Sequence, residues 1–225
     1  MRQSKRIAIF FDCENVSVKH LQEIYDQLAN DGQVIMNRAY ADWNNSRHNK
    51  WREALSDFAI EQIQPNSSGK NSSDMKIVID VMKTIYEKKV DIIVLVSSDS
   101  DFSSLAIEIK SQALTAIGFG EEKSSNALRK AFTTFIELPL RKKEIKSDEL
   151  LQILKDAVEH QKDESGYALI SQVGSYLARK DASLISKNYG FNRWGDAFKK
   201  YSEHFEIDYK DERKSVIMVR AVNLL

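Results

Sequence analysis

The sequence predicts an α/β fold with a parallel sheet covered by helices on both faces, followed by a small α+β unit. Through residues 1–140, short apolar runs alternate with stretches of helical period, which is the pattern of βαβ units. After Pro139 the order changes to three or four short helices and then two strands, as in a winged helix. A length of 225 residues also favours two domains over one.

Six strands and four helices are expected in the first part. The strand candidates are RIAIFF, QVIMNRAYA, IEQIQ, DIIVLV, LTAIGFG and TTFIEL. The helix candidates are VKHLQEIYDQLA, NKWREALSDFA, MKIVIDVMKTIYEKK and FSSLAIEIKSQ. In the third helix, Ile77, Val81 and Ile85 recur at helical spacing. A continuous apolar run such as DIIVLV is typical of a strand that is buried on both faces of a parallel sheet.

Pro139 ends the series of strands, and the charged segment after it is expected to be a linker. The predicted domains are therefore residues 1–140 and 148–225, with a linker at 141–147. The second domain offers the helices ELLQILKDAVEH, YALISQVGSYLARK and FNRWGDAFKKYSE, and the strands HFEIDY and SVIMVRAV joined by the turn KDERK.

The composition excludes several classes of function. One cysteine, Cys13, rules out internal disulfides and multi-cysteine zinc sites. No apolar run approaches the roughly 18 residues of a membrane span, and the N-terminus reads as a first strand rather than a signal peptide. We therefore expect a soluble, cytoplasmic protein. The 33 basic and 33 acidic side chains cancel, but a neutral total can hide a basic groove beside an acidic metal site.

Acidic side chains stand where buried strands end. Asp99 and Asp101 follow the run VLVSS, two residues apart, so an extended backbone would direct both to one side. Asp12 closes RIAIFFD, and Asp74 ends the polar loop PNSSGKNSSD. Open parallel sheets bind ligands outside the carboxyl ends of their strands, so we expect these acids to meet at one edge.

Converging carboxylates repel one another, and a divalent cation would offset that repulsion. Oxygen ligands without clustered His or Cys favour Mg²⁺ or Mn²⁺ over zinc, and such an ion can activate water for attack on a phosphodiester. Helix capping is the alternative. Asp101 is suitably placed to cap FSSLAIEIK, and Asp12 precedes an apparent helix start at residues 15–17.

Other polar residues lie near the expected edge. Asn15 is a candidate for orienting a carboxylate or a water. The candidates for contact with nucleic acid are Lys70, Asn71, Ser97, Ser98 and Lys123. Asp80 follows Asp74 by six residues and cannot share its helix face, so we expect it to face a neighbouring element or solvent.

Four segments resemble, in order, the NYN domain of the LabA-like family, a branch of the PIN-like nucleases. They are IAIFFDCENV, GKNSSDMKIVIDVM, VDIIVLVSSDSDFSSLA and AIGFGEEKSSNALRKAFTTFIEL, within residues 5–138. The resemblance implies a PIN-like three-layer sandwich and a metal-dependent ribonuclease site. Its implied catalytic residues are Asp12, Asn15, Asp74, Asp99 and Asp101, with the four acids as ligands of Mg²⁺ or Mn²⁺.

Residues 148–222 resemble an OST-HTH/LOTUS domain. The matching positions are Gly166, Val173 with Gly174, Tyr189 to Phe191, and Val219 with Arg220. The resemblance implies a small winged helix that binds RNA, and in some relatives a helicase instead. Basic candidates for the RNA backbone are Arg179, Lys180, Lys187, Lys199 and Lys200. The rings of Tyr189 and Phe191 could stack on bases, but aromatic residues at helix junctions more often pack the core.

These features together predict a metal-dependent endoribonuclease whose C-terminal domain raises the local concentration of RNA, single-stranded RNA in the first place. Two further assemblies are candidates: a complex of the LOTUS domain with a protein partner, and a homodimer. We do not expect binding to a membrane. One alternative is a non-catalytic RNA-binding or protein-interaction adaptor that retains a metal-binding acidic cluster. Another is a Toprim-like fold, for which Glu14, Asp99 and Asp101 would serve and Asp74 would have no use.

Overall fold

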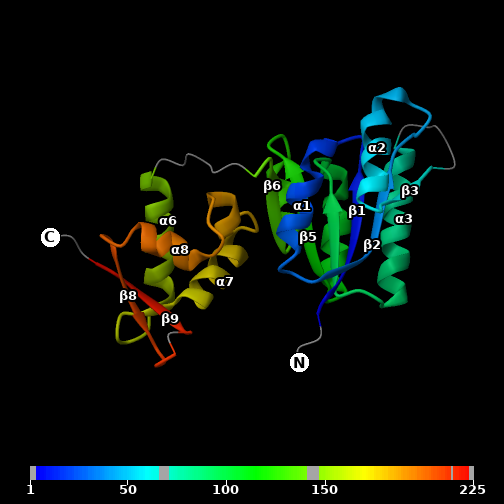
Figure 1. The fold of residues 1–225 in the computed structure, drawn as a ribbon. Helices are drawn as coiled ribbons and strands as arrows, with labels where there is room; N and C mark the ends of the chain where they lie inside the picture. The colour runs from blue at the N-terminus through cyan, green and yellow to red at the C-terminus, as the bar shows by residue number, and fades with distance from the viewer. Residues whose placement is uncertain (1–3, 66–70, 141–146, 214, 223–225) are drawn as a thin grey trace. The chain divides into compact units, whose positions relative to one another are not determined.

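The computed structural model describes residues 4–65, 71–140, 147–213 and 215–222. It divides into two compact units, Met1–Pro139 and Leu140–Leu225. The first contains a six-stranded sheet and the second a three-stranded sheet (Figure 1). The predicted α/β class and the smaller α+β unit are both confirmed.

All six strands of the first unit pair in parallel, in the order β3-β2-β1-β4-β5-β6. Their bounds are β1 (Arg6–Asp12), β2 (Gln33–Tyr40), β3 (Glu61–Ile63), β4 (Ile92–Val96), β5 (Thr115–Glu121) and β6 (Thr134–Leu138). Four of them lie within a predicted apolar run, and β1 and β5 each extend one residue beyond theirs, to Asp12 and Glu121. The chain moves outward from β1 to β3 and then returns to β4, so the strand order reverses between β1 and β4. This reversal is the point at which open α/β sheets bind ligands.

Helices cover both faces of this sheet. They are α1 (Leu21–Leu28), α2 (Asn49–Asp57), α3 (Ser72–Glu87), α4 (Ser103–Ser111) and α5 (Asn126–Ala131). Short 3₁₀ turns η1 (Val18–His20), η2 (Ser46–His48) and η3 (Ser100–Phe102) precede three of them. Adjacent residues of β1 point to opposite faces. Phe11 contacts Tyr25 of α1 and Trp51 of α2, whereas Phe10 stacks on Tyr40, which bonds to α3.

One helix of the first unit was not predicted. Helix α5 has only six residues, too few for a hydrophobic period to show in the sequence. Its start carries a recognisable cap, because Ser125 accepts a hydrogen bond from the backbone N–H of Leu128 at 3.2 Å.

The second unit packs three helices on an antiparallel sheet of order β7-β9-β8. Its elements are α6 (Ser147–Gln161), β7 (Ala168–Leu169), α7 (Ile170–Lys180), η4 (Ser186–Tyr189), α8 (Trp194–Lys200), β8 (Phe205–Tyr209) and β9 (Ile217–Ala221). A Cβ atom on Gly174 would lie 2.9 Å from the Trp194 ring, so only glycine permits this close approach of α7 and α8. Tyr189 and Phe191 pack against the core, as preferred from the sequence.

The prediction was wrong at the start of α7. Ala168 and Leu169 were expected to begin this helix, but they form β7 and pair with Met218 and Val219 of β9. Strand β7 has two residues, and its pairing partner lies about 50 residues later, so the local pattern carries no sign of it.

Candidate active site

The predicted acids lie at the carboxyl end of the parallel sheet, beside the reversal of strand order. Asp12 ends β1, Asp99 follows β4, and Asp74 stands in the first turn of α3. Burial raises the pKa of Asp74 to about 6, and neighbouring negative charges add to the shift. Those charges are Asp12, Asp99, Glu14 and Asp101. The structure therefore brings these carboxylates within electrostatic reach of one another.

Asp12 is held rigidly at the base of this edge. Its side chain is buried, and Oδ2 accepts hydrogen bonds from Ser97 Oγ at 2.6 Å and Asn15 Nδ2 at 2.9 Å. Oδ1 accepts from the backbone N–H of Glu14 at 3.2 Å. Burial raises the pKa of Asp12, and these hydrogen bonds oppose the rise because they stabilise the charged form. Asn15 thus makes the contact that an orienting residue needs.

The capping role considered for Asp101 belongs to Asp99. Asp99 Oδ1 accepts a hydrogen bond from the backbone N–H of Asp101 at 2.9 Å and caps η3, whereas α4 begins after Phe102 without a side-chain cap. The backbone N–H of Asp99 in turn donates to Ser97 Oγ at 3.0 Å. Ser97 therefore couples the positions of Asp99 and Asp12. Asp101 is exposed one residue into the 3₁₀ turn.

The acids predicted as metal ligands all carry carboxylate side chains, which are donors that Mg²⁺ and Mn²⁺ prefer. Among the residues that the structure describes, no three His, Cys, Asp or Glu side chains lie close enough together to hold an ion. The donor chemistry nevertheless suits Mg²⁺ or Mn²⁺, because the acids within electrostatic reach of Asp74 offer only carboxylate oxygens. Mg²⁺ usually takes one or two protein carboxylates and completes its shell with waters and substrate phosphates. The residues therefore fit a Mg²⁺ or Mn²⁺ ion that is held by one or two of these carboxylates.

Two more acids belong to this edge. Glu14 Oε1 accepts hydrogen bonds from Ser73 Oγ at 3.0 Å and from the backbone N–H of Asp42 at 3.2 Å. Glu121 ends β5, and its Oε1 accepts from the backbone N–H of Ser17 at 3.2 Å. Sequence reasoning missed Glu121, although it is an acid at a strand end, which is the signal that singled out Asp12.

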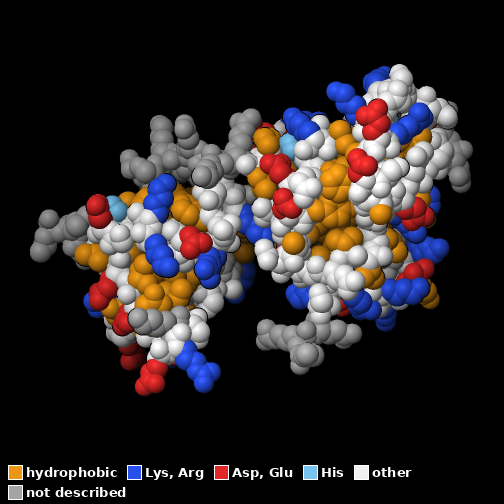
Figure 2. Space-filling model, in the orientation of Figure 1, with side chains coloured by type: hydrophobic (Ala, Val, Ile, Leu, Met, Phe, Trp, Pro, Cys, Tyr) orange, Lys and Arg blue, Asp and Glu red, His pale blue; other side chains and the backbone are white. Residues whose placement is uncertain are grey.

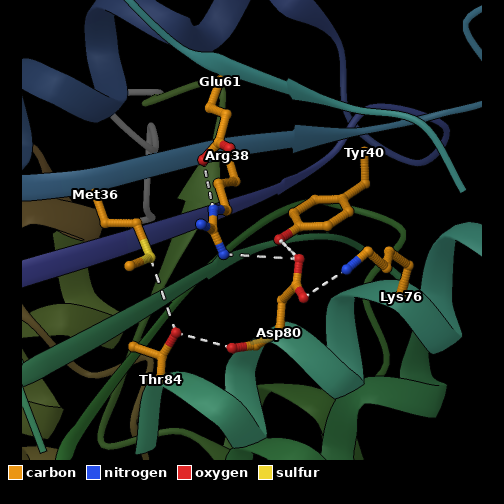
Figure 3. Close-up of polar contacts among 7 residues, drawn as sticks. All are labelled: Met36, Arg38, Tyr40, Glu61, Lys76, Asp80 and Thr84. Atoms are coloured by element: carbon orange, nitrogen blue, oxygen red, sulfur yellow. Dashed lines mark hydrogen bonds and ion pairs between the residues drawn. The ribbon is translucent and has the colours of Figure 1, made fainter. Parts of the chain in front are cut away.

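Asp80 faces a neighbouring element, which is one of the two orientations expected from the sequence; the other was toward solvent. Figure 3 shows its buried carboxylate directed from α3 toward β2, between Tyr40 and Lys76. Tyr40 Oη donates to Asp80 Oδ2 at 2.9 Å, and Lys76 Nζ donates to Oδ1 at 2.7 Å. Arg38 Nη1 lies 3.7 Å from Oδ2. This polar cluster ties the middle of α3 to β2 and so fixes the helix that carries Asp74.

Comparison with protein families matches residues 6–140 to the NYN domain and residues 142–217 to the OST-HTH/LOTUS domain. The chain belongs to the NYN domain family. Both resemblances drawn from the motifs are thus confirmed, and they support a nuclease and RNA-binding role. Comparison with the curated proteins gives no match.

A solved structure is similar to part of this NYN protein. The crystal structure of a protein of unknown function from Vibrio parahaemolyticus shares 22% sequence identity and a TM-score of 0.48. The similarity covers 61% of the present chain and 95% of the other. A likeness at this level decides nothing about function. Among the described helices, none combines the length and apolar character needed to cross a membrane.

The five residues predicted to contact nucleic acid have different surroundings in the NYN domain. Ser97 and Ser98 are buried, and their hydroxyls bond to Asp12 and to the backbone N–H of Glu121, so they support the site rather than offer a surface. Asn71 is exposed just before α3. Lys123 is exposed too, with Nζ 4.0 Å from Glu121 Oε2. Lys70 lies outside the described residues.

Basic side chains gather on the OST-HTH/LOTUS domain. Figure 2 shows Lys and Arg side chains on the surface over α8. Lys199 and Lys200 are exposed at the end of this helix, and Arg179 and Lys180 at the end of α7. Lys200 Nζ lies 5.7 Å from the Phe191 ring centroid and 5.9 Å from that of Tyr201. Cations and rings side by side suit a single-stranded nucleic acid.

Proposed function

We propose that this protein is an endoribonuclease that depends on Mg²⁺ or Mn²⁺, with the NYN domain cleaving RNA and the OST-HTH/LOTUS domain binding it. The observation that carries the proposal is the placement of Asp12, Asp74 and Asp99 at the ligand-binding edge of the sheet. The raised pKa of Asp74 supports it, because burial and, after it, the charges of neighbouring carboxylates disfavour the ionised form. A divalent ion bound there would supply charge stabilisation and an activated water for hydrolysis of the phosphodiester.

The residues of the NYN domain have separate parts in this proposal. Asp12 would be a fixed ligand, since Ser97 and Asn15 hold its carboxylate in one orientation. Asp74 and Asp99 are less buried and would complete the protein's share of the ligands, with Asp101 next to them. Asp74 must lose its proton to bind an ion. Its raised pKa therefore predicts weaker metal binding below a pH of about 6.

The OST-HTH/LOTUS domain would hold the substrate. Lys199 and Lys200 would meet phosphates, and RNA bound there would be present at a raised local concentration for the NYN domain. Single-stranded RNA is the favoured substrate, because the partly buried rings of Phe191 and Tyr201 lie beside Lys200 on the basic surface.

The test is cleavage of an end-labelled single-stranded RNA by the purified chain in Mn²⁺, in Mg²⁺ and in chelator. Asp99→Asn should abolish metal-dependent cleavage, whereas the matched control Asp57→Asn, an exposed acid at the end of α2, should not. Equal cleavage by both variants would remove the acidic edge from the mechanism.

A non-catalytic adaptor is the second candidate. One observation favours it: Asp12 and Asp99 already have structural roles, since Ser97 and Asn15 hold the Asp12 carboxylate and Asp99 caps η3. The adaptor would bind RNA through the OST-HTH/LOTUS domain and leave every RNA intact in every metal. The same experiment separates the two functions when RNA binding is measured alongside cleavage.

A further inference from the structure

The outer face of α3 is apolar. Met75, Ile79, Met82 and Tyr86 are 61%, 56%, 39% and 88% exposed, and they follow one another at intervals of four, three and four residues. That spacing places them in one row along the helix. The opposite face is apolar as well, with Ile77, Val81 and Ile85 buried against the sheet. We name the exposed row the α3 stripe.

A helix on the surface of a sheet normally presents polar side chains to solvent. Scattered exposed apolar residues are common, and Ile107 of α4, 57% exposed, is one of them. A continuous row of four large side chains on one helix is different, because contiguous apolar patches mark interaction surfaces. None of the four side chains of the α3 stripe is among the residues proposed to hold the metal or to bind RNA, so neither proposed activity accounts for it.

We propose that the α3 stripe is the interface of a homodimer in which α3 packs antiparallel against α3 of a second copy. The order of the side chains is self-complementary. About a twofold axis placed midway between residues 80 and 81, Met75 lies opposite Tyr86 of the second copy, and Ile79 lies opposite Met82. Each end thus pairs a thioether with an aromatic ring, which is a favourable contact. Closed twofold interfaces require this self-matching.

The charges at the ends of α3 favour the same arrangement. At its C-terminal end Lys83, Lys88 and Lys89 are exposed, and Glu87 is the one acid among them, 3.2 Å from Lys89. At its N-terminal end stand Asp74 and the acidic edge, and the one lysine there within α3, Lys76, is paired with Asp80. An antiparallel pair sets the basic end of each copy beside the acidic end of the other, and the helix dipoles also oppose favourably. A parallel pair would place like charges together.

The size of the contact predicts a weak dimer. Helix α3 has 16 residues, so it is about 24 Å long and about 10 Å wide. A contact of that size falls below the roughly 800 Å² per partner of a standard stable complex. We therefore expect a dimer that forms at micromolar concentrations and dissociates on dilution.

Sedimentation velocity of the full chain over a range of concentrations tests this interface. The wild type should shift from monomer to dimer as concentration rises. Ile79→Asp should weaken dimerisation at least about tenfold, because it buries a charge at the centre of the contact. Ile107→Asp, an equally exposed isoleucine on another helix, should have no effect. A wild type that is monomeric throughout, or an Ile79→Asp variant that dimerises like the wild type, would overturn the proposal. This readout does not depend on nuclease activity.

Oxidative cross-linking tests the antiparallel register. Cys13 is buried and adds no background. Met75→Cys protein mixed with Tyr86→Cys protein should give a mixed cross-linked dimer, whereas each variant alone should give little. Efficient cross-linking of Met75→Cys to itself would mean a parallel pair and would refute the antiparallel arrangement. Circular dichroism spectra that match the wild type should show that each variant is folded.

Discussion

Replacing Asp74 by Asn should stabilise the metal-free protein while it removes the activity. Burial raises the pKa of Asp74 from an ordinary 3.8 to about 6, and the neighbouring carboxylates add to the shift. The charged form of Asp74 is therefore less favourable in the folded protein than in the unfolded chain. Asparagine has nearly the same shape and no charge, so it removes the repulsion but supplies a poorer ligand.

The magnitude follows from the two pKa values. A difference of about two pH units between the folded and unfolded pKa corresponds to about 3 kcal/mol. Asp74 is only partly buried, and solvent screening reduces the cost to about 1 to 2 kcal/mol. Above a pH of about 6, Asp74→Asn should therefore increase the free energy of unfolding by that amount.

The sign of the pH dependence is fixed by linkage. Between pH 3.8 and about 6 the folded state holds the Asp74 proton more firmly than the unfolded state does, so the wild type loses stability as pH rises through this window. The destabilisation caused by the ionised Asp74 side chain is fully present above this pH window and absent well below it. The advantage of Asp74→Asn should accordingly be complete at pH 8 and vanish near pH 3.8.

The assay is urea unfolding of wild type and Asp74→Asn in chelator at pH 8 and at pH 4, followed by tryptophan fluorescence. Trp43 and Trp51 report on the NYN domain. In Mn²⁺ the difference in the free energy of unfolding between Asp74→Asn and the wild type should be smaller, because the ion stabilises the wild type by mass action and stabilises the variant less. A variant that is less stable than the wild type at pH 8 in chelator, or a gap that persists unchanged at pH 4, would refute the electrostatic account of this edge.

Three other outcomes are expected. Tyr40→Phe should lower the free energy of unfolding by about 1 to 2 kcal/mol in urea titrations, because a buried carboxylate loses one of its donors while its lysine remains. Ser97→Ala should slow cleavage at least about tenfold and move the acid limb of the pH–rate profile to higher pH. The reason is that the pKa of Asp12 rises when its 2.6 Å hydrogen bond from Ser97 is lost. An unmoved profile would contradict this role of Ser97. Replacing Lys199 and Lys200 by Glu should weaken RNA binding and reduce the slope of log affinity against log salt by about 1 to 2, as measured by fluorescence anisotropy; an unchanged slope would place the RNA elsewhere.

The elements that were predicted correctly depend on local pattern. A run such as Ile92–Val96 is apolar at every position, which is typical of a strand covered on both faces. The alternation of such runs with helical period then leads to a parallel sheet, and a parallel sheet puts Asp12 and Asp99 at one edge. The elements that were missed, α5 and β7, are too short for a period to show.

The sequence by itself determined the class of the fold, the family and the edge at which the acids gather, because each follows from the order of residues along single elements. The tertiary structure alone decided how those residues interact. In it, Asp99 caps η3, the Ser97 hydroxyl donates a hydrogen bond to Asp12, and Tyr40 donates one to Asp80. It also left one apolar face of α3 uncovered while burying the other. Such choices depend on contacts between residues far apart in the chain, and periodicity along one element carries no information about them.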